Sequence, residues 1–150
     1  MYIDDNMSPE IWGKYGWYFW HLVTQAYPEY PTEEDKKNYY QYFQSLKNVL
    51  PCKKCQKNLA VHLEKYPLTD EVLSSRENLV KWGIDVHNVV NYYIGKPMLS
   101  YDQALAQMDK ISNPKKSKTN KTFWCLLLLV IIIILVYLIY RFIARKKLSK

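Results

Sequence analysis

The sequence predicts an all-α protein whose helices are followed by a single carboxy-terminal transmembrane helix. Serine, threonine and proline residues mark successive helix starts and ends, and no long segment alternates with the period of two that is typical of strands. The sequence has no glycine-rich turn of the kind that joins a strand to a nucleotide-binding helix. Residues 122–140 contain no charged side chain. At about 1.5 Å per residue, a helix of that length spans a bilayer.

The first two helices are predicted from their capping residues. Ser8 is a helix N-cap and Pro9 occupies the first helical position, so a helix is expected from there to about residue 26. Thr32 and Asp35 have the spacing of a capping box and predict the start of a second helix. Pro51 marks the end of that helix.

The third and fourth helices follow the same logic. The third is expected to begin at Cys52, directly after a proline, and to end at Tyr66. Ser74 and Glu77 predict a capping box at the start of the fourth helix. Gly95 marks the end of the fourth helix because glycine is the preferred residue just after a helix.

A short fifth helix is predicted from the capping pattern of Ser100 and Gln103 and ends near residue 110. The chain is therefore divided into four segments. These are a helical domain at 1–110, a basic linker at 111–121, a transmembrane helix at 122–142 and a basic tail at 143–150.

Charge is unevenly distributed along the chain. All 14 acidic residues precede Ile111, together with 12 of the 21 basic ones, so the predicted domain is slightly acidic. The basic excess flanks the apolar run, which is typical of a membrane anchor and not of a nucleic-acid-binding face. We therefore predict no nucleic-acid partner. Basic residues on the two sides of the span nearly balance, so the positive-inside rule does not choose the side on which the domain lies.

The motif PCKKC is the first candidate for chemistry. Two residues separate Cys52 from Cys55, which brings both sulfurs onto one helical turn, close enough for a disulfide. The helix N-terminus and the neighbouring Lys53 and Lys54 favour a thiolate there. The third cysteine, Cys125, lies inside the apolar run and is not part of this motif. Because of the spacing and the positive charge around Cys52 and Cys55, a redox-active pair is the favoured interpretation.

The alternative is a structural zinc site in a membrane-tethered helical binding module, because half of a zinc site has the same cysteine spacing. Such a site needs two further ligands. The sequence offers His21, His62 and His87, at spacings unlike those of the common zinc modules. The expected metal content is therefore none, and His62 is given a structural role.

Two further helices carry aromatic and hydrogen-bonding residues on one face. On the fourth helix, Trp82, His87 and Asn91 share a broad face, and Asn88 lies beside them. On the first helix the corresponding residues are Lys14, Trp17, Tyr18 and His21. Taken alone, the face on the fourth helix is also compatible with a partly exposed helix surface that carries a capped histidine, and the aromatic residues of the first helix are also compatible with ordinary core packing. Together with a cysteine pair, they indicate a site for a flat, hydrogen-bonding, redox-active ring.

Three segments of the sequence together resemble the Erv/ALR family of FAD-linked sulfhydryl oxidases. They are WGKYGWYFWH with YPEYP, then PCKKC, then KWGIDVHNVVNYYIGKP, and the resemblance covers residues 8–109. It implies a four-helix bundle with a short fifth helix, FAD at the mouth of the bundle, and a non-covalent homodimer. With its predicted membrane anchor, the sequence looks most like the viral members of the family, and this resemblance implies a host or virion membrane. The cofactor-binding residues carried over by position are Gly13, Lys14, Trp17, His21, Trp82, His87, Asn88, Asn91 and Lys96.

The resemblance also implies a mechanism. Cys52 would face incoming thiols and Cys55 would lie against the flavin, so that electrons pass from a protein dithiol through the Cys52–Cys55 pair and FAD to oxygen, with release of hydrogen peroxide. Many relatives carry an extra shuttle cysteine pair, which is absent from this sequence. The expected partner is therefore a protein dithiol substrate, or a small thioredoxin-like dithiol carrier. Lys14 stands where many relatives have arginine, which keeps the charge and loses the planar fork.

Overall fold

The structure, a computed structural model, describes residues 7–112 and 121–148. It divides into two units, Met1–Asn113 and Pro114–Lys150. The regular elements that it describes are all helices, which confirms the predicted fold class. They are α1 (Pro9–Gln25), α2 (Glu33–Val49), α3 (Lys53–Lys65), the short 3-10 helix η1 (Val72–Ser74), α4 (Arg76–Tyr93), α5 (Tyr101–Ser112) and α6 (Lys121–Leu148).

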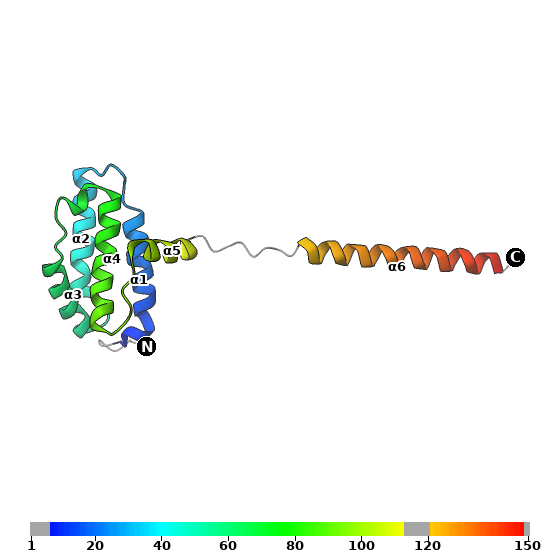
Figure 1. The fold of residues 1–150 in the computed structure, drawn as a ribbon, viewed down its shortest axis with the longest axis horizontal. Helices are drawn as coiled ribbons and strands as arrows, with labels where there is room; N and C mark the ends of the chain where they lie inside the picture. The colour runs from blue at the N-terminus through cyan, green and yellow to red at the C-terminus, as the bar shows by residue number, and fades with distance from the viewer. Residues whose placement is uncertain (1–6, 113–120, 149–150) are drawn as a thin grey trace. The chain divides into compact units, whose positions relative to one another are not determined.

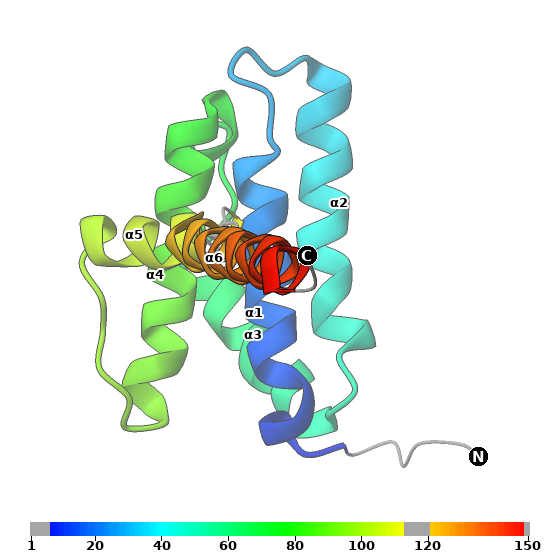
Figure 2. The ribbon, with the colours of Figure 1, turned by 90° about the vertical axis from the view of Figure 1, so that its right-hand side faces the viewer.

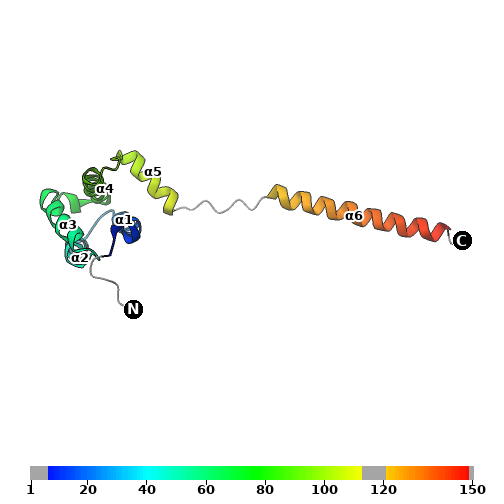
Figure 3. The same cartoon turned by 90° about the horizontal axis from the view of Figure 1, so that it is seen from below.

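Helices α1 to α4 form the predicted four-helix bundle (Figures 1 and 2). Helix α1 packs on α4, α2 packs on α3, and the short α5 lies against α1 and α4. Seen along the bundle, α5 lies outside the ring of four helices (Figure 3). Large aromatic and aliphatic side chains from α1 to α4 and from the segment after α1 fill the centre, and their burial favours folding. They include Trp20, Tyr27, Phe43, Leu59, Leu63, Leu79, Trp82 and Val86.

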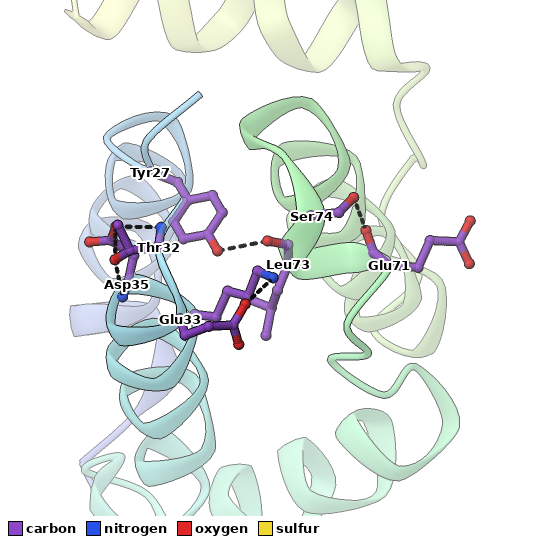
Figure 4. A network of polar contacts seen from close by, with 8 residues as sticks. Tyr27, Thr32, Glu33, Asp35, Glu71, Leu73 and Ser74 are labelled. Carbon is purple, nitrogen blue, oxygen red and sulfur yellow. Dashed lines mark hydrogen bonds and ion pairs between the residues drawn. The ribbon is translucent and has the colours of Figure 1, made fainter. Parts of the chain in front are cut away.

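Three of the predicted helix starts are confirmed by their hydrogen bonds. The Ser8 hydroxyl accepts a bond from the backbone N–H of Glu10 (3.3 Å). Thr32 and Asp35 form a complete capping box at the start of α2 (Figure 4). At the start of α5, the Gln103 side chain accepts from the backbone N–H of Ser100, and the Ser100 hydroxyl accepts from that of Gln103. Local sequence therefore sets these boundaries.

The predicted cap of the fourth helix is wrong by one residue. The N-cap of α4 is Ser75, whose hydroxyl accepts from the backbone N–H of Asn78 (3.2 Å). Ser74 instead belongs to η1 and donates to the carbonyl of Glu71 (Figure 4). Glu77 forms an ion pair with Lys81 one turn later (2.6 Å) and takes no part in a capping box. The extra turn of 3-10 helix therefore moves the start of α4 along the chain.

A buried tyrosine joins the end of α1 to η1. Tyr27 is fully buried, and its hydroxyl donates to the carbonyl of Leu73 (2.8 Å; Figure 4). Burial raises the pKa of Tyr27 to about 12, with smaller contributions from nearby acidic groups. The hydroxyl therefore remains a donor at neutral pH, as this bond requires.

Gly83 allows α1 and α4 to approach closely. A Cβ atom at this position would lie 3.0 Å from Cγ2 of Thr24 and 3.0 Å from Nε1 of Trp20. The indole rings of Trp20 and Trp82 stack next to this contact, with centroids 5.3 Å apart. The close packing brings the polar face of α1 against that of α4, where the candidate site is found.

The predicted carboxy-terminal segments are described in part, and the helix found there is α6. In the described part of the chain, no helix is both long and apolar enough to cross a membrane, so the predicted span at 122–142 is not confirmed. Helix α5 ends at Ser112, slightly beyond the predicted boundary. Most of the predicted linker at 111–121 lies outside the described residues, as does the end of the predicted tail.

Candidate active site

The two cysteines of PCKKC form a disulfide at the start of α3. Cys52 is the N-cap residue, with extended backbone angles, and Cys55 lies in the first turn. Their Cα atoms are 5.1 Å apart. The Cys52 sulfur also accepts a hydrogen bond from the backbone N–H of Cys55 (3.1 Å). After reduction, the helix N-terminus would stabilise a thiolate at Cys52, since unpaired backbone N–H groups favour negative charge there.

Cys52, which the resemblance implies is the cysteine that faces incoming thiols, is the less exposed of the two cysteines. Cys52 is 4 % exposed, whereas Cys55 is partly exposed. As the N-cap residue, Cys52 directs its side chain toward the backbone N–H of Cys55, in the first turn of α3. The spacing of the motif predicted the bond but carried no information on which sulfur solvent reaches.

Trp17, His21 and His87 form a compact cluster between α1 and α4. The rings of Trp17 and His87 are stacked, with centroids 3.9 Å apart and planes 8° apart. Nε2 of His21 lies 2.8 Å from Nδ1 of His87, a hydrogen bond between residues on different helices. The two predicted faces therefore meet, and the structure brings these three candidate residues together.

Both imidazoles of the cluster are neutral at pH 7. Burial lowers the pKa of His21 to about 4. Burial, with smaller contributions from His21 and Lys96, lowers the pKa of His87 to about 3. In the neutral pair, the N–H of one ring donates a hydrogen bond to the unprotonated nitrogen of the other. Nδ1 of His21 is buried and has no hydrogen-bond partner, so this atom is available to a ligand that carries a complementary polar group.

We expect the melting temperature to fall as the pH is lowered from about 7 to about 5. A histidine whose pKa is lower in the folded state binds more protons when unfolded, so its contribution to stability is fully present above the unfolded value of 6.5 and is lost as the pH falls toward about 4. The His21→Gln/His87→Gln variant should show a shallower decrease in a pH series of thermal melts. A wild-type melting temperature that does not change over this range would contradict the neutral pair.

The remaining candidates on α4 have distinct positions. The side chain of Asn88 exchanges two hydrogen bonds with the backbone of Leu99, at 2.8 and 2.9 Å, and so holds the connection to α5. Asn91 is buried, and its carbonyl accepts the backbone N–H of Lys96 (2.8 Å) across the turn at Gly95, where φ is 70°. The Lys96 side chain is exposed just beyond this turn.

Trp82 and the start of α1 lie around the cluster. The Trp82 indole is buried in the bundle core and donates to the carbonyl of Tyr66 (3.0 Å). Gly13 is half-buried and Lys14 is exposed, one turn before Trp17. The ammonium of Lys14 lies 5.5 Å from the ring centre of Tyr18. The indole N–H of Trp82 is therefore bonded inside the bundle and is not free for a ligand, whereas the exposed Lys14 side chain can reach one at the edge of the cluster.

Two further polar side chains on α3 and α1 are buried. The His62 ring is buried and stacks with Tyr93 (centroids 5.3 Å apart), which connects α3 to the last turn of α4. His62 lies seven residues after Cys55, on the same face of α3, so its spacing was the available signal. The indole N–H of Trp20 is buried without a partner.

The zinc interpretation lacks a ligand set in the part of the chain that the structure describes. No group of three or more histidine, cysteine, aspartate or glutamate side chains is placed to hold a metal ion within those residues. Cys52 and Cys55 are bonded to each other, so neither offers a thiolate to a metal.

Comparison with known proteins identifies the family. Residues 14–113 match the Erv1 / Alr family. A protein of Acanthamoeba polyphaga mimivirus, named a probable FAD-linked sulfhydryl oxidase, is 57% identical over 144 residues and covers 96% of this chain and 100% of its own length. The FAD-linked sulfhydryl oxidase ERV2 of Saccharomyces cerevisiae is 31% identical over 101 residues, which are 67% of this chain and 48% of that protein. The crystal structure of the FAD binding domain of Erv1 from Saccharomyces cerevisiae superposes with a TM-score of 0.61 at 27% identity, and the match covers 70% of this chain and 93% of that one. With a disulfide at the start of α3 and an imidazole cluster between α1 and α4, the chain belongs to the Erv1 / Alr family, as its motifs predicted.

Proposed function

We propose that this protein is an FAD-dependent thiol oxidase that forms disulfides in protein dithiols. The observation that carries the proposal is the Cys52–Cys55 disulfide at a helix N-terminus, in the arrangement of a thiol-exchange centre. Relatives named FAD-linked sulfhydryl oxidases share most of the chain. The zinc alternative has no ligand set in the described residues to support it.

The residues between α1 and α4 fit FAD. A flavin and an adenine are flat and carry hydrogen-bonding edges, and the cluster offers stacked rings beside a buried nitrogen without a partner. Bound FAD supplies a two-electron acceptor for the reduced cysteine pair and a route for those electrons to oxygen. The residues that would hold it are Gly13, Lys14, Trp17, His21, Trp82, His87, Asn88, Asn91 and Lys96.

The cysteines perform thiol exchange. A substrate thiolate attacks one sulfur of the Cys52–Cys55 disulfide, forms a mixed disulfide, and expels the other cysteine as a thiolate. The second substrate thiolate then attacks the mixed disulfide, which forms the substrate disulfide and expels the attacked cysteine as a thiolate. Both electrons now reside on the cysteine pair. We propose that the substrate thiolate attacks the sulfur of Cys52. Because Cys52 is buried, its sulfur has to become accessible when a partner binds. The sequence holds no second cysteine pair, so a protein dithiol or a separate dithiol carrier reaches this disulfide directly.

The proposal is tested with the purified full chain. We expect a yellow protein with flavin absorption bands that consumes oxygen and releases hydrogen peroxide when dithiothreitol is added. Incubation with substoichiometric monothiol, followed by acid quenching before a second thiol or the expelled cysteine displaces it, should leave an adduct on Cys52 that peptide mass mapping locates. A colourless protein that contains zinc would overturn the proposal, and an adduct on Cys55 would reverse the assignment of the two cysteines.

We further propose a homodimer that forms through one side of α1. Its exposed apolar side chains recur at helical spacing and form a continuous stripe, which a second copy would cover. The stripe consists of Ile11, Tyr15, Phe19 and Leu22. Phe19 lies near Tyr42 of α2, so the stripe continues toward the neighbouring helix. Light scattering should give a dimer mass for the full chain and a monomer mass for Phe19→Glu. A monomeric wild-type protein would contradict the stripe as an interface.

We also propose that residues 122–142 anchor the protein in a membrane. The support is the sequence, which has no charged residue at 122–140 and places Trp124 and Tyr137 toward the two ends of the run, as in interfacial belts. The anchored domain would belong to a single-pass protein of a host or virion membrane. We expect the full chain to stay in the membrane fraction during alkaline carbonate extraction. Release by carbonate would refute the anchor.

A further inference from the structure

Three lysines surround the disulfide. Lys53 and Lys54 lie between the two cysteines, and Lys57 follows one turn after Lys53. All three side chains are exposed. Within the residues that the structure describes, none of them forms an ion pair. Their charge is therefore available to any molecule that approaches the disulfide.

Two segments at this end of the bundle contain no acidic residue, and Glu10, in the first turn of α1, is the acid that the described helices place at the same end. Residues 36–63 include six lysines and neither aspartate nor glutamate. The acids of α2 are in its first turn, at the opposite end of the helix from the one that leads to the disulfide (Figures 1 and 2). Residues 86–101, at the end of α4 and beyond, also lack acids. Glu77 and Asp85, which precede them on α4, are bonded to Lys81 and Tyr101.

Folding alone does not account for lysines at this position. The backbone N–H groups of a helix N-terminus favour negative charge and disfavour cations. Helices α1, α2, α4 and α5 each have an acidic residue in the first turn, whereas the first turn of α3 has none and begins with Lys53 and Lys54. The lysines therefore weaken the local helix, and the disulfide beside them is the feature on which their charge can act.

We propose that Lys53, Lys54 and Lys57 form a cationic rim that selects dithiol substrates presented on an acidic protein surface. The inference rests on the proposed thiol oxidase activity and names the substrate class of that site. The chemical step is unchanged: a substrate thiolate displaces one cysteine thiolate, and the second substrate thiolate completes the substrate disulfide as two electrons pass to the Cys52–Cys55 pair. Acidic groups that flank the substrate thiols face the rim during this step.

The rim is expected to act on encounter more than on the exchange reaction itself. Charge complementarity raises association rates and sets partner choice, and exposed charges are screened by salt. The preference for an acidic substrate should therefore appear mainly in KM and should shrink as ionic strength rises. An effect on thiol reactivity would instead change kcat for every substrate alike.

The experiment compares three substrates of the full-length, FAD-loaded protein. Two are synthetic peptides with the same Cys-X-X-Cys core, one flanked by glutamates and the other by lysines, and the third is uncharged dithiothreitol. At low ionic strength we expect kcat/KM for the acidic peptide to exceed that for the basic peptide by about tenfold or more. At high salt the two values should converge.

Charge-reversed variants connect the preference to the rim. In Lys53→Glu/Lys54→Glu and in Lys57→Glu, the ratio of acidic to basic kcat/KM should fall below that of the wild type, and in the double variant it should invert. Lys37→Glu, an equally exposed lysine in the amino-terminal half of α2, is the matched control and should keep the wild-type ratio. If dithiothreitol turnover is normal and the wild type oxidises the two peptides with equal kcat/KM, the proposed rim is wrong. It is also wrong if Lys37→Glu changes the ratio of the two kcat/KM values as much as the rim variants do. Absence of dithiothreitol turnover in the wild type would count against the oxidase itself.

Discussion

Replacing either Cys52 or Cys55 with serine is expected to abolish dithiol oxidation, with a loss of at least about a thousandfold in oxygen consumption. Each half of the pair is required, because the disulfide that accepts electrons from the substrate cannot form with one sulfur. Removing either residue should therefore cost as much as removing both. Peroxide release with dithiothreitol as substrate measures the loss.

The same variants should keep their helices and their flavin. The pair closes a loop of only three residues in sequence separation, so its contribution to folding is small next to that of the aromatic core. Far-ultraviolet circular dichroism and the flavin spectrum check this point. Cys125→Ser is the matched control, since Cys125 is a free thiol in α6 and should be dispensable for turnover. Most of the turnover surviving in Cys52→Ser or Cys55→Ser would remove the motif from the mechanism.

Local signals in the sequence predicted the helices well. The starts of α1, α2 and α5 follow from one side chain and the backbone within three residues of it, which a sequence displays directly. The start of α4 was misplaced because two serines are adjacent and each can cap a helix. The choice of Ser75 depends on η1, which is fixed by the burial of Leu73 against the core. Packing decided between two locally equivalent caps.

The candidate site was predictable as two helix faces and not as a set of contacts. Spacing placed Trp17 with His21 and, separately, His87 with Asn91 on single faces. The hydrogen bond between His21 and His87 joins residues 66 positions apart, and it forms because α1 and α4 approach closely at Gly83. No local pattern shows such an approach. The burial of Cys52 was not readable from the sequence for the same reason, since exposure depends on the assembled bundle.

Removing the imidazole at position 87 is expected to weaken FAD binding by about ten- to a hundredfold. His87→Ala removes a ring that we place against FAD, and it also removes the stack on Trp17 and the hydrogen bond with His21, which orient the neighbouring rings and are contacts of a kind worth about 0.5 to 1.5 kcal/mol each. Its loss also leaves the buried His21 ring unpaired on both nitrogens. His87→Phe keeps an aromatic ring without the hydrogen bond and should fall between the wild type and His87→Ala. Titration of the flavin-free protein with FAD gives the affinities.

Melting temperatures measured with and without FAD distinguish a loss of FAD binding from a general loss of stability. A ligand that binds only the folded state raises stability by mass action, by about 2.7 kcal/mol at a hundred times its Kd. At one fixed FAD concentration, the FAD-induced rise in melting temperature should therefore be smaller in His87→Ala and in Asn91→Ala than in the wild type. Asn38→Ala, on the exposed side of α2, is the matched control and should keep the full rise. A variant that only weakened the fold would melt at a lower temperature with and without FAD and would show the wild-type rise. If both His87→Ala and Asn91→Ala behave in this way, FAD does not lie against this face of α4.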